Sequence, residues 1–208
     1  MLFNSEIFIF IFLPVAFVGF YILGKHCDSV NYSKWYLVIA SLFFYGWWNI
    51  DYVPFLIISV AINFYLGNAT RLARKNKQLL LIIGIVINLS FLGYFKYFNF
   101  FIDNLNILFK GDYFVENIIL PLAISFYTFQ QIGYLLDSYK GKTRQESFLN
   151  YSLFVVFFPQ LIAGPIVIYR EIFPQFKKST FGKFKNTDLI VGLTIFFIGL
   201  FKKVVIAD

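Results

Sequence analysis

The stretch Ile7–Leu23 reads IFIFIFLPVAFVGFYIL and contains no charged residue. At about 1.5 Å of rise per residue, a helix of this length nearly crosses a hydrocarbon core of about 30 Å. Further apolar stretches of the same kind follow at Trp35–Trp48, Val53–Leu66, Leu79–Phe95 and Leu189–Ala207. This pattern predicts an all-α, polytopic membrane protein in which residues 1–208 form a single integral membrane domain.

The composition agrees with a membrane location. Hydrophobic residues make up 59% of the chain and charged residues 14%, whereas soluble proteins carry roughly 25% charged residues. The net charge of +7 lies in short loops, where lipid headgroups and topology explain it, so we do not expect nucleic-acid binding. Cys27 is the single cysteine, and the sequence contains no Cys/His cluster that predicts a metal.

The loop charges predict the topology. The segments Gly24–Lys34, Asn68–Gln78 and Gly141–Asn150 are basic, whereas Asn49–Tyr52 carries only Asp51. Basic loops remain cytoplasmic. We therefore expect the basic segments inside and the N-terminus outside.

Two segments depart from simple spanning helices. Phe95–Phe109 follows the spanning stretch Leu79–Phe95 and is aromatic but interrupted by polar residues, which predicts an interfacial helix lying flat on the outer face. Tyr151–Gly164 is short, is broken by Pro159 and Gly164 and lies between two basic segments. This arrangement predicts a re-entrant element that ends at Pro165 and is packed in protein or lines a cavity.

Polar side chains recur along Ile118–Tyr139, where Pro121 is expected to start or kink a helix. They lie at Tyr127, Gln130, Gln131, Tyr134 and Asp137. This spacing places them on one face of a helix, and lipid cannot satisfy them. The face either bonds neighbouring helices or forms the wall of a cavity for a polar ligand; both interpretations stay open.

Longer motifs resemble a known family. The segments are LPLAISFYTFQQIGYLLDSYKG (Leu120–Gly141), FFPQLIAGPIVIYREIFPQF (Phe157–Phe176) and GLFKKVVIAD (Gly199–Asp208). Together with ASLFFYGWW (Ala40–Trp48) and GYFKYFNFF (Gly93–Phe101), they resemble the membrane-bound O-acyltransferases. The branch they resemble is that of the bacterial alginate O-acetyltransferase membrane subunit.

The resemblance implies acyl transfer from a cytoplasmic donor, commonly acetyl-CoA, to an extracytoplasmic polysaccharide hydroxyl. It also implies a bacterial inner-membrane location, a funnel of helices, no bound cofactor and an extracytoplasmic acetyltransferase partner. The candidate funnel wall consists of Tyr127, Gln130, Gln131, Tyr134, Asp137 and Gln160.

The family's catalytic histidine follows the segment that GLFKKVVIAD resembles, and no residue of this chain matches it. His26, the single histidine, lies in a different region, and we interpret it as an interfacial loop residue. We expect the chain to be the N-terminal part of a longer protein and to be inactive alone. The alternatives are a membrane transporter, which also uses broken helices, and a non-catalytic membrane scaffold for a periplasmic partner.

Overall fold

The fold is all-α, as the sequence predicts. The computed structural model describes residues 3–26, 29–109, 118–161, 164, 169–178 and 181–207. In these ranges every regular element is a helix. The elements are η1 (Phe8–Phe12), α1 (Leu13–His26), α2 (Val30–Gly46), η2 (Ile50–Tyr52), α3 (Val53–Leu72), α4 (Lys77–Phe109), α5 (Ile124–Tyr139), α6 (Phe148–Val156), α7 (Phe158–Leu161), α8 (Tyr169–Phe176), α9 (Asn186–Phe201) and η3 (Lys202–Ala207).

Four of the described helical stretches are long and apolar enough to cross a membrane. They are Phe8–His26, Ile50–Leu72, Lys77–Leu108 and Asn186–Ile206. The helix predicted at Trp35–Trp48 is α2, which is slightly shorter than these. The polytopic character of the chain is therefore confirmed.

Local signals in the sequence set several helix starts. Ser29 caps α2 by accepting a hydrogen bond from the amide of Asn31 at 3.3 Å, as expected of an N-cap serine. Pro54 lies in the first turn of α3, where its missing N–H costs nothing. Pro121 precedes a turn in which the amide of Ile124 bonds the Pro121 carbonyl, and α5 begins directly after it.

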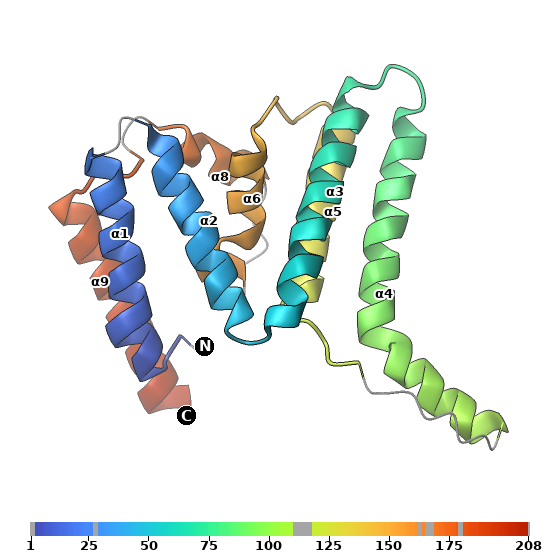
Figure 1. Cartoon of the computed structure of the whole chain (residues 1–208), viewed down its shortest axis with the longest axis horizontal. Coiled ribbons are helices and arrows are strands. Elements are labelled where there is room, and N and C mark those ends of the chain that lie inside the picture. The colour runs from blue at the N-terminus through green and yellow to red at the C-terminus, as the bar shows by residue number, and fades with distance from the viewer. Residues whose placement is uncertain are drawn as a thin grey trace.

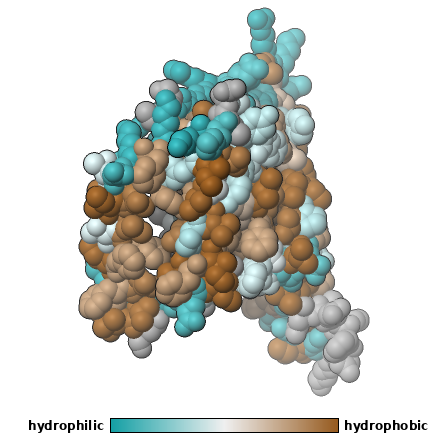
Figure 2. All heavy atoms as spheres, turned by 60° about the vertical axis from the view of Figure 1, so that its left-hand side comes forward, coloured by the Kyte–Doolittle hydropathy of each residue, from teal (hydrophilic) through white to brown (hydrophobic). Residues whose placement is uncertain are grey.

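The helices alternate in direction, so every second connection lies at the same end of the bundle, and the connections at one end are polar. Helices α1, α3 and α5 finish, and α2, α4 and α6 begin, together at the top of Figure 1. Figure 2 shows hydrophilic side chains over this end, above a broad hydrophobic surface. We call it the basic end, because lysines and arginines gather in its connecting segments and in the helix turns next to them. They include Lys25, Lys34, Arg74, Lys75, Lys142, Arg144, Lys177, Lys178 and Lys183.

The short helix α6 lies at the centre of the core. Every residue from Leu149 to Val156 is buried, and α6 packs against α2, α3, α5 and α8. Helix α9 is the opposite case, since none of its residues is buried. An apolar helix exposed on all sides requires lipid or further protein around it.

The segment Phe95–Phe109 is helical, but it is not an element of its own, because it continues the helix that begins at Lys77. Its position at the outer interface stays a prediction. Hydrogen-bonded helix continues through the polar residues, so α4 is one element, although Figure 1 shows that its C-terminal part changes direction and projects from the bundle. Asn99 of α4 holds the returning chain, because its side-chain Nδ2 donates to the Ile118 carbonyl at 2.9 Å and its Oδ1 accepts from the Ile118 backbone amide at 3.0 Å. Likewise Arg71 and Lys77, expected in a loop, lie in α3 and α4.

The predicted break in Tyr151–Gly164 is present. Helix α6 begins earlier than expected, at Phe148, and ends before Phe157, whose φ of −53° and ψ of 110° are not helical. Helix α7 then adds one turn, and Gly164 is a bend. Residues 162, 163 and 165–168, including Pro165, lie outside the described residues, so the full re-entrant path stays a prediction.

Candidate functional site

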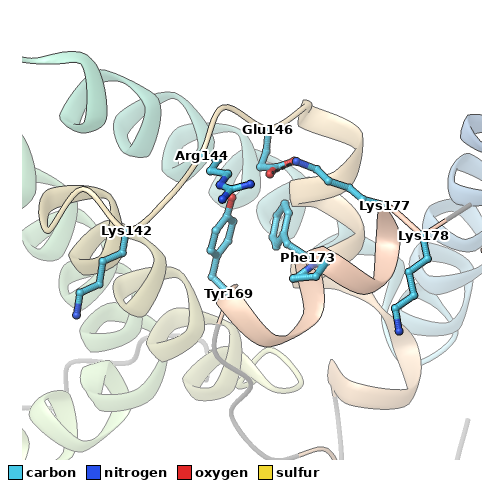
Figure 3. Close-up of a pocket in the computed structure, with 8 residues that line it drawn as sticks. Lys142, Arg144, Glu146, Tyr169, Phe173, Lys177 and Lys178 are labelled. Carbon is cyan, nitrogen blue, oxygen red and sulfur yellow. Dashed lines mark hydrogen bonds and ion pairs between the residues drawn. The ribbon is translucent and has the colours of Figure 1, made fainter.

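A pocket of about 510 Å³ opens at the basic end. It lies between α8 and the segment that connects α5 to α6. Its lining consists of Lys142, Arg144, Glu146, Tyr169, Phe173, Pro174, Lys177 and Lys178. Figure 3 shows Glu146 and Lys177 facing each other, and Lys142 and Lys178 extending at the two edges. We call this the basic pocket.

A buried carboxylate organises the basic pocket. Lys177 Nζ lies 2.6 Å from Glu146 Oε1, and the side chain of Glu146 is only 3% exposed. On its other side, Glu146 Oε2 accepts from the Asn150 amide at 3.4 Å. Asn150 Oδ1 in turn accepts from Lys34 Nζ at 2.8 Å. Helices α2, α6 and the end of α8 are therefore joined by one polar network.

An aromatic cluster forms the inner wall. The rings of Tyr169 and Phe173 have centroids 3.9 Å apart, and Tyr134 lies 5.4 Å from Tyr169. Burial, reinforced by the Glu146 carboxylate, raises the pKa of Tyr169 above its ordinary value, so its phenol stays protonated at neutral pH. Arg144 reaches toward the hydroxyl end of Tyr169 in Figure 3.

The basic pocket has the chemistry of an anion site. Among the described residues, four cationic side chains line it, against the one carboxylate of Glu146, and the cation of Lys34 lies behind that carboxylate. Cationic clefts raise the local concentration of anionic ligands. In the described part of the chain no group of three His, Cys, Asp or Glu side chains is arranged to hold a metal ion.

The predicted polar face of α5 is mostly buried in protein: its residues are not among those that line the basic pocket, although Tyr134 packs against Tyr169 of the pocket's inner wall. Tyr127, Gln130, Gln131 and Tyr134 are all buried, whereas Asp137 is half-buried. Gln131 Nε2 donates to Ser59 Oγ of α3 at 3.2 Å. Gln160, on α7, is half-buried. These contacts support the interpretation of the face as a helix-packing surface; a cavity wall stays a prediction.

Gln130 also has a role that the sequence did not predict: its side chain caps the break between α6 and α7. Its Nε2 donates to the Phe154 carbonyl at 2.8 Å. The amide that would bond this carbonyl in a continuous helix belongs to Phe158, and it instead bonds Ser41 Oγ of α2 at 3.1 Å. Two of the backbone groups released by the break, the Phe154 carbonyl and the Phe158 amide, are thus satisfied by side chains, as broken helices in membranes require.

Sequence reasoning missed four members of the network around the basic pocket: Lys34, Glu146, Asn150 and Tyr169. One signal was present for Glu146, which is the only acidic residue between Lys140 and Arg170. A lone carboxylate among basic and apolar residues indicates a structural ion pair. His26 is exposed at the end of α1 and does not line the basic pocket.

Comparison with known proteins agrees with these observations. Residues 144–208 match the profile of MBOAT, the membrane-bound O-acyltransferase family. The predicted resemblance to the membrane-bound O-acyltransferases is confirmed. Apart from Lys142, the described residues that line the basic pocket fall within the matched region.

Individual relatives align over all of the chain. A peptidoglycan O-acetyltransferase of Helicobacter pylori is 44% identical over 235 aligned positions, which cover 45% of its own length. Probable alginate O-acetylases of Pseudomonas aeruginosa and Azotobacter vinelandii are 38% and 37% identical over 216 positions, covering 40% and 42% of theirs. The chain therefore spans less than half the length of these relatives. No solved structure matches the chain.

Proposed function

We propose that this chain is the donor-receiving part of a membrane-bound O-acyltransferase. The complete enzyme transfers an acyl group, acetyl by analogy with the names of the relatives, to a hydroxyl of a cell-envelope polysaccharide. The observation that carries the proposal is that the basic pocket is built almost wholly from residues of the region that matches the family.

The donor that suits this pocket is an activated thioester with phosphate groups, such as acetyl-CoA. It is a substrate, and no cofactor is required. Lysine and arginine side chains attract and hydrogen-bond phosphate oxygens. In the transfer, the acceptor hydroxyl oxygen forms a bond to the acyl carbon, the bond from that carbon to sulfur breaks, and the hydroxyl proton passes to a base. The role of this part of the chain is to hold the donor and align it.

We place the donor's path along the polar residues beneath the basic pocket. The wall would consist of Tyr127, Gln130, Gln131, Tyr134, Asp137 and Gln160. The burial of the first four within this part of the chain argues that most of the wall also has a packing role. A group that serves both roles would lose stability and transfer together when it is replaced.

The orientation follows from the charge distribution. The basic end faces the cytoplasm, because short loops rich in lysine and arginine are retained there. The N-terminus then lies outside the inner membrane, and an extracytoplasmic acetyltransferase is the expected partner. Single cysteines at Lys142 and Lys178, in a Cys27→Ser background, would test this. Both should be labelled only from the cytoplasmic side, and labelling from opposite sides would contradict the orientation.

The donor proposal is tested with the complete protein, as the cell makes it, in membrane vesicles. The Lys142→Gln/Lys178→Gln variant removes two exposed cations of the basic pocket. It should raise the KM for acetyl-CoA about tenfold and leave the KM for the acceptor unchanged, because two partly screened charges contribute on the order of 1 kcal/mol or less each. The matched control Arg74→Gln/Lys75→Gln removes equal charge from the connection between α3 and α4.

An equal effect of both double variants would show that only the overall charge of the basic end matters, and would contradict the pocket assignment. Movement of intact acetyl-CoA across the membrane, with no transfer to polysaccharide, would favour the transporter alternative. Acceptor modification by the partner alone, without this chain, would favour the scaffold alternative.

A further inference from the structure

Two neighbouring cavities run along the side of α1, away from the basic pocket. The outer cavity measures about 790 Å³ and the inner one about 380 Å³. Phe17, Tyr21, Gly182 and Lys183 line both cavities. Figure 2, in which this side of the molecule comes forward, shows hydrophilic side chains above a hydrophobic surface with a hollow in it. We call the two cavities together the α1 groove.

Aromatic contacts fix the walls of the α1 groove. The ring of Phe184 lies 5.2 Å from Tyr21 and 6.4 Å from Phe17, measured between centroids. Deeper in, the rings of Phe20 and Phe181 lie 5.3 Å apart. These edge-to-face packings are favourable arrangements of aromatic pairs, so the groove is a formed feature of the fold.

A close backbone approach holds the other wall. A side chain at Gly24 would overlap the carbonyl of Gly182, and Gly182 itself has a φ of +82°. Glycine is required at both positions, at Gly24 for space and at Gly182 for conformation. The turn at residues 181–184 is therefore held directly against the end of α1.

The groove combines two kinds of surface. Along α1, which belongs to a candidate membrane span, the walls of the groove consist mainly of aromatic and aliphatic side chains. Its end at the basic side carries the exposed cations Lys25 and Lys183, neither of which forms an ion pair within the described residues. No carboxylate lines the outer cavity among the described residues; Asp188 lines only the inner one.

We infer that the α1 groove binds an anionic phospholipid. Its headgroup phosphate lies between Lys25 and Lys183, and an acyl chain lies against Phe17 and Tyr21. A cationic side chain near the membrane surface attracts anionic lipid, and apolar walls hold a hydrocarbon chain by excluding it from water. A free phosphate ion would use the two lysines and leave the aromatic wall without a role. The inference is independent of acyl transfer.

The test measures lipid retention by native mass spectrometry of the complete protein in mild detergent. The protein is titrated with phosphatidylglycerol or with phosphatidylcholine that has the same acyl chains. The parent should retain phosphatidylglycerol preferentially. Lys25→Gln/Lys183→Gln should weaken this retention about tenfold and leave that of phosphatidylcholine unchanged. The charge-preserving variant Lys25→Arg/Lys183→Arg should behave like the parent.

Two further variants separate the groove from general surface effects. Arg74→Gln/Lys75→Gln removes the same charge at the same end and should retain phosphatidylglycerol normally. Val18→Trp narrows the outer cavity without changing charge and should weaken retention of both lipids. Lipid retention is compared only between variants whose melting temperatures equal that of the parent.

Four results would overturn the inference. The first is equal retention of the two lipids by the parent. The second is equal losses in the groove variant and the control variant. The third is displacement of phosphatidylglycerol by millimolar inorganic phosphate, which would show an ion site without a lipid site. Absence of lipid from the complete protein would mean that other protein covers the groove, and would also overturn it.

Discussion

Lys177 and Glu146 form an ion pair with very unequal environments. Their charged atoms lie 2.6 Å apart, but the lysine side chain is 48% exposed and the glutamate side chain 3%. The carboxylate is therefore the member that depends on the pair. It also lies near the buried Lys34, to which Asn150 connects it. The Glu146 carboxylate thus pairs with Lys177 directly and with Lys34 through Asn150. This network connects α2, α6 and the end of α8.

Glu146→Gln should destabilise the fold by about 1–3 kcal/mol, because it leaves the buried Lys34 cation without a nearby carboxylate. The glutamine side chain has the same size as glutamate and can still bond Asn150, so the lost stability measures the contribution of the negative charge. The measurement is thermal or detergent-induced unfolding of the purified protein. Lys178→Gln, on an exposed neighbour of the ion pair, should change stability by less than about 0.5 kcal/mol. Equal effects of the two variants would contradict the role of Glu146.

Asn63 and Asn88 join α3 to α4 through a reciprocal amide pair. Asn88 Nδ2 donates to Asn63 Oδ1 at 2.6 Å, and Asn63 Nδ2 donates to Asn88 Oδ1 at 3.2 Å. Asn63→Leu should cost about 1 kcal/mol, since hydrogen bonds between membrane helices contribute about that much. Asn88 Oδ1 then loses its donor, whereas Asn88 Nδ2 keeps its bond to the Gly84 carbonyl at 2.8 Å. Asn63→Leu/Asn88→Leu should cost less than the sum of the single variants, as measured by a double-mutant cycle of unfolding.

Asn68→Leu on the same helix serves as the control for that cycle, because no hydrogen bond of the Asn68 side chain is recorded in the described structure. Additive costs for Asn63→Leu and Asn88→Leu would show that the two amides act independently.

Gly67 allows α3 to approach α5. A side chain there would overlap the ring of Tyr134, which is buried and packs against Tyr151 at 4.5 Å between centroids. Gly67→Ala should lower the melting temperature, because the ring cannot move without disturbing the aromatic cluster. Gly133→Ala, on α5, meets nothing within 4 Å and should be neutral or stabilising through its better helix propensity. A tolerated Gly67→Ala would show that the cluster is loosely packed.

The sequence predicts most helices of this chain because apolar length is a local property. The stretches around α1, α2, α3 and α9 carry few charges, and each became a helix near the expected bounds. The continuity of α4, which the sequence did not predict, has a physical reason. Lys96, Asn99 and Asp103 affect where a helix lies relative to lipid, but backbone hydrogen bonding continues through them, so polarity did not end the helix.

The candidate site was predictable only in part, because its contacts are far apart in sequence. The periodicity of α5 predicts a polar face, and its first four members are buried. Their partners are not predictable, since Gln131 bonds Ser59 across 72 residues. Lys34 and Asn150 are separated by 116 residues. No local sequence pattern predicts such a pair. The network behind the basic pocket is therefore visible only in the structure, where α2 packs against α6.

Gln130 distinguishes the two interpretations of the polar face. Gln130→Leu keeps similar bulk but removes the donor that satisfies the Phe154 carbonyl. If Gln130 only caps the break, its replacement should cost about 1–3 kcal/mol, and transfer activity should fall in parallel with the folded fraction. Ser41→Ala, which releases the Phe158 amide at the other side of the same break, should then show the same relation between stability and activity.

If Gln130 also contacts the donor, Gln130→Leu should lose more transfer activity than Ser41→Ala at equal folded fraction, with a raised KM for the donor. Unfolding and initial rates are measured on the same preparations of the complete protein, so that each rate is expressed per folded molecule. Normal stability and normal rates in Gln130→Leu would contradict both roles. In that case another group must donate to the Phe154 carbonyl, and we would no longer assign Gln130 to the proposed wall.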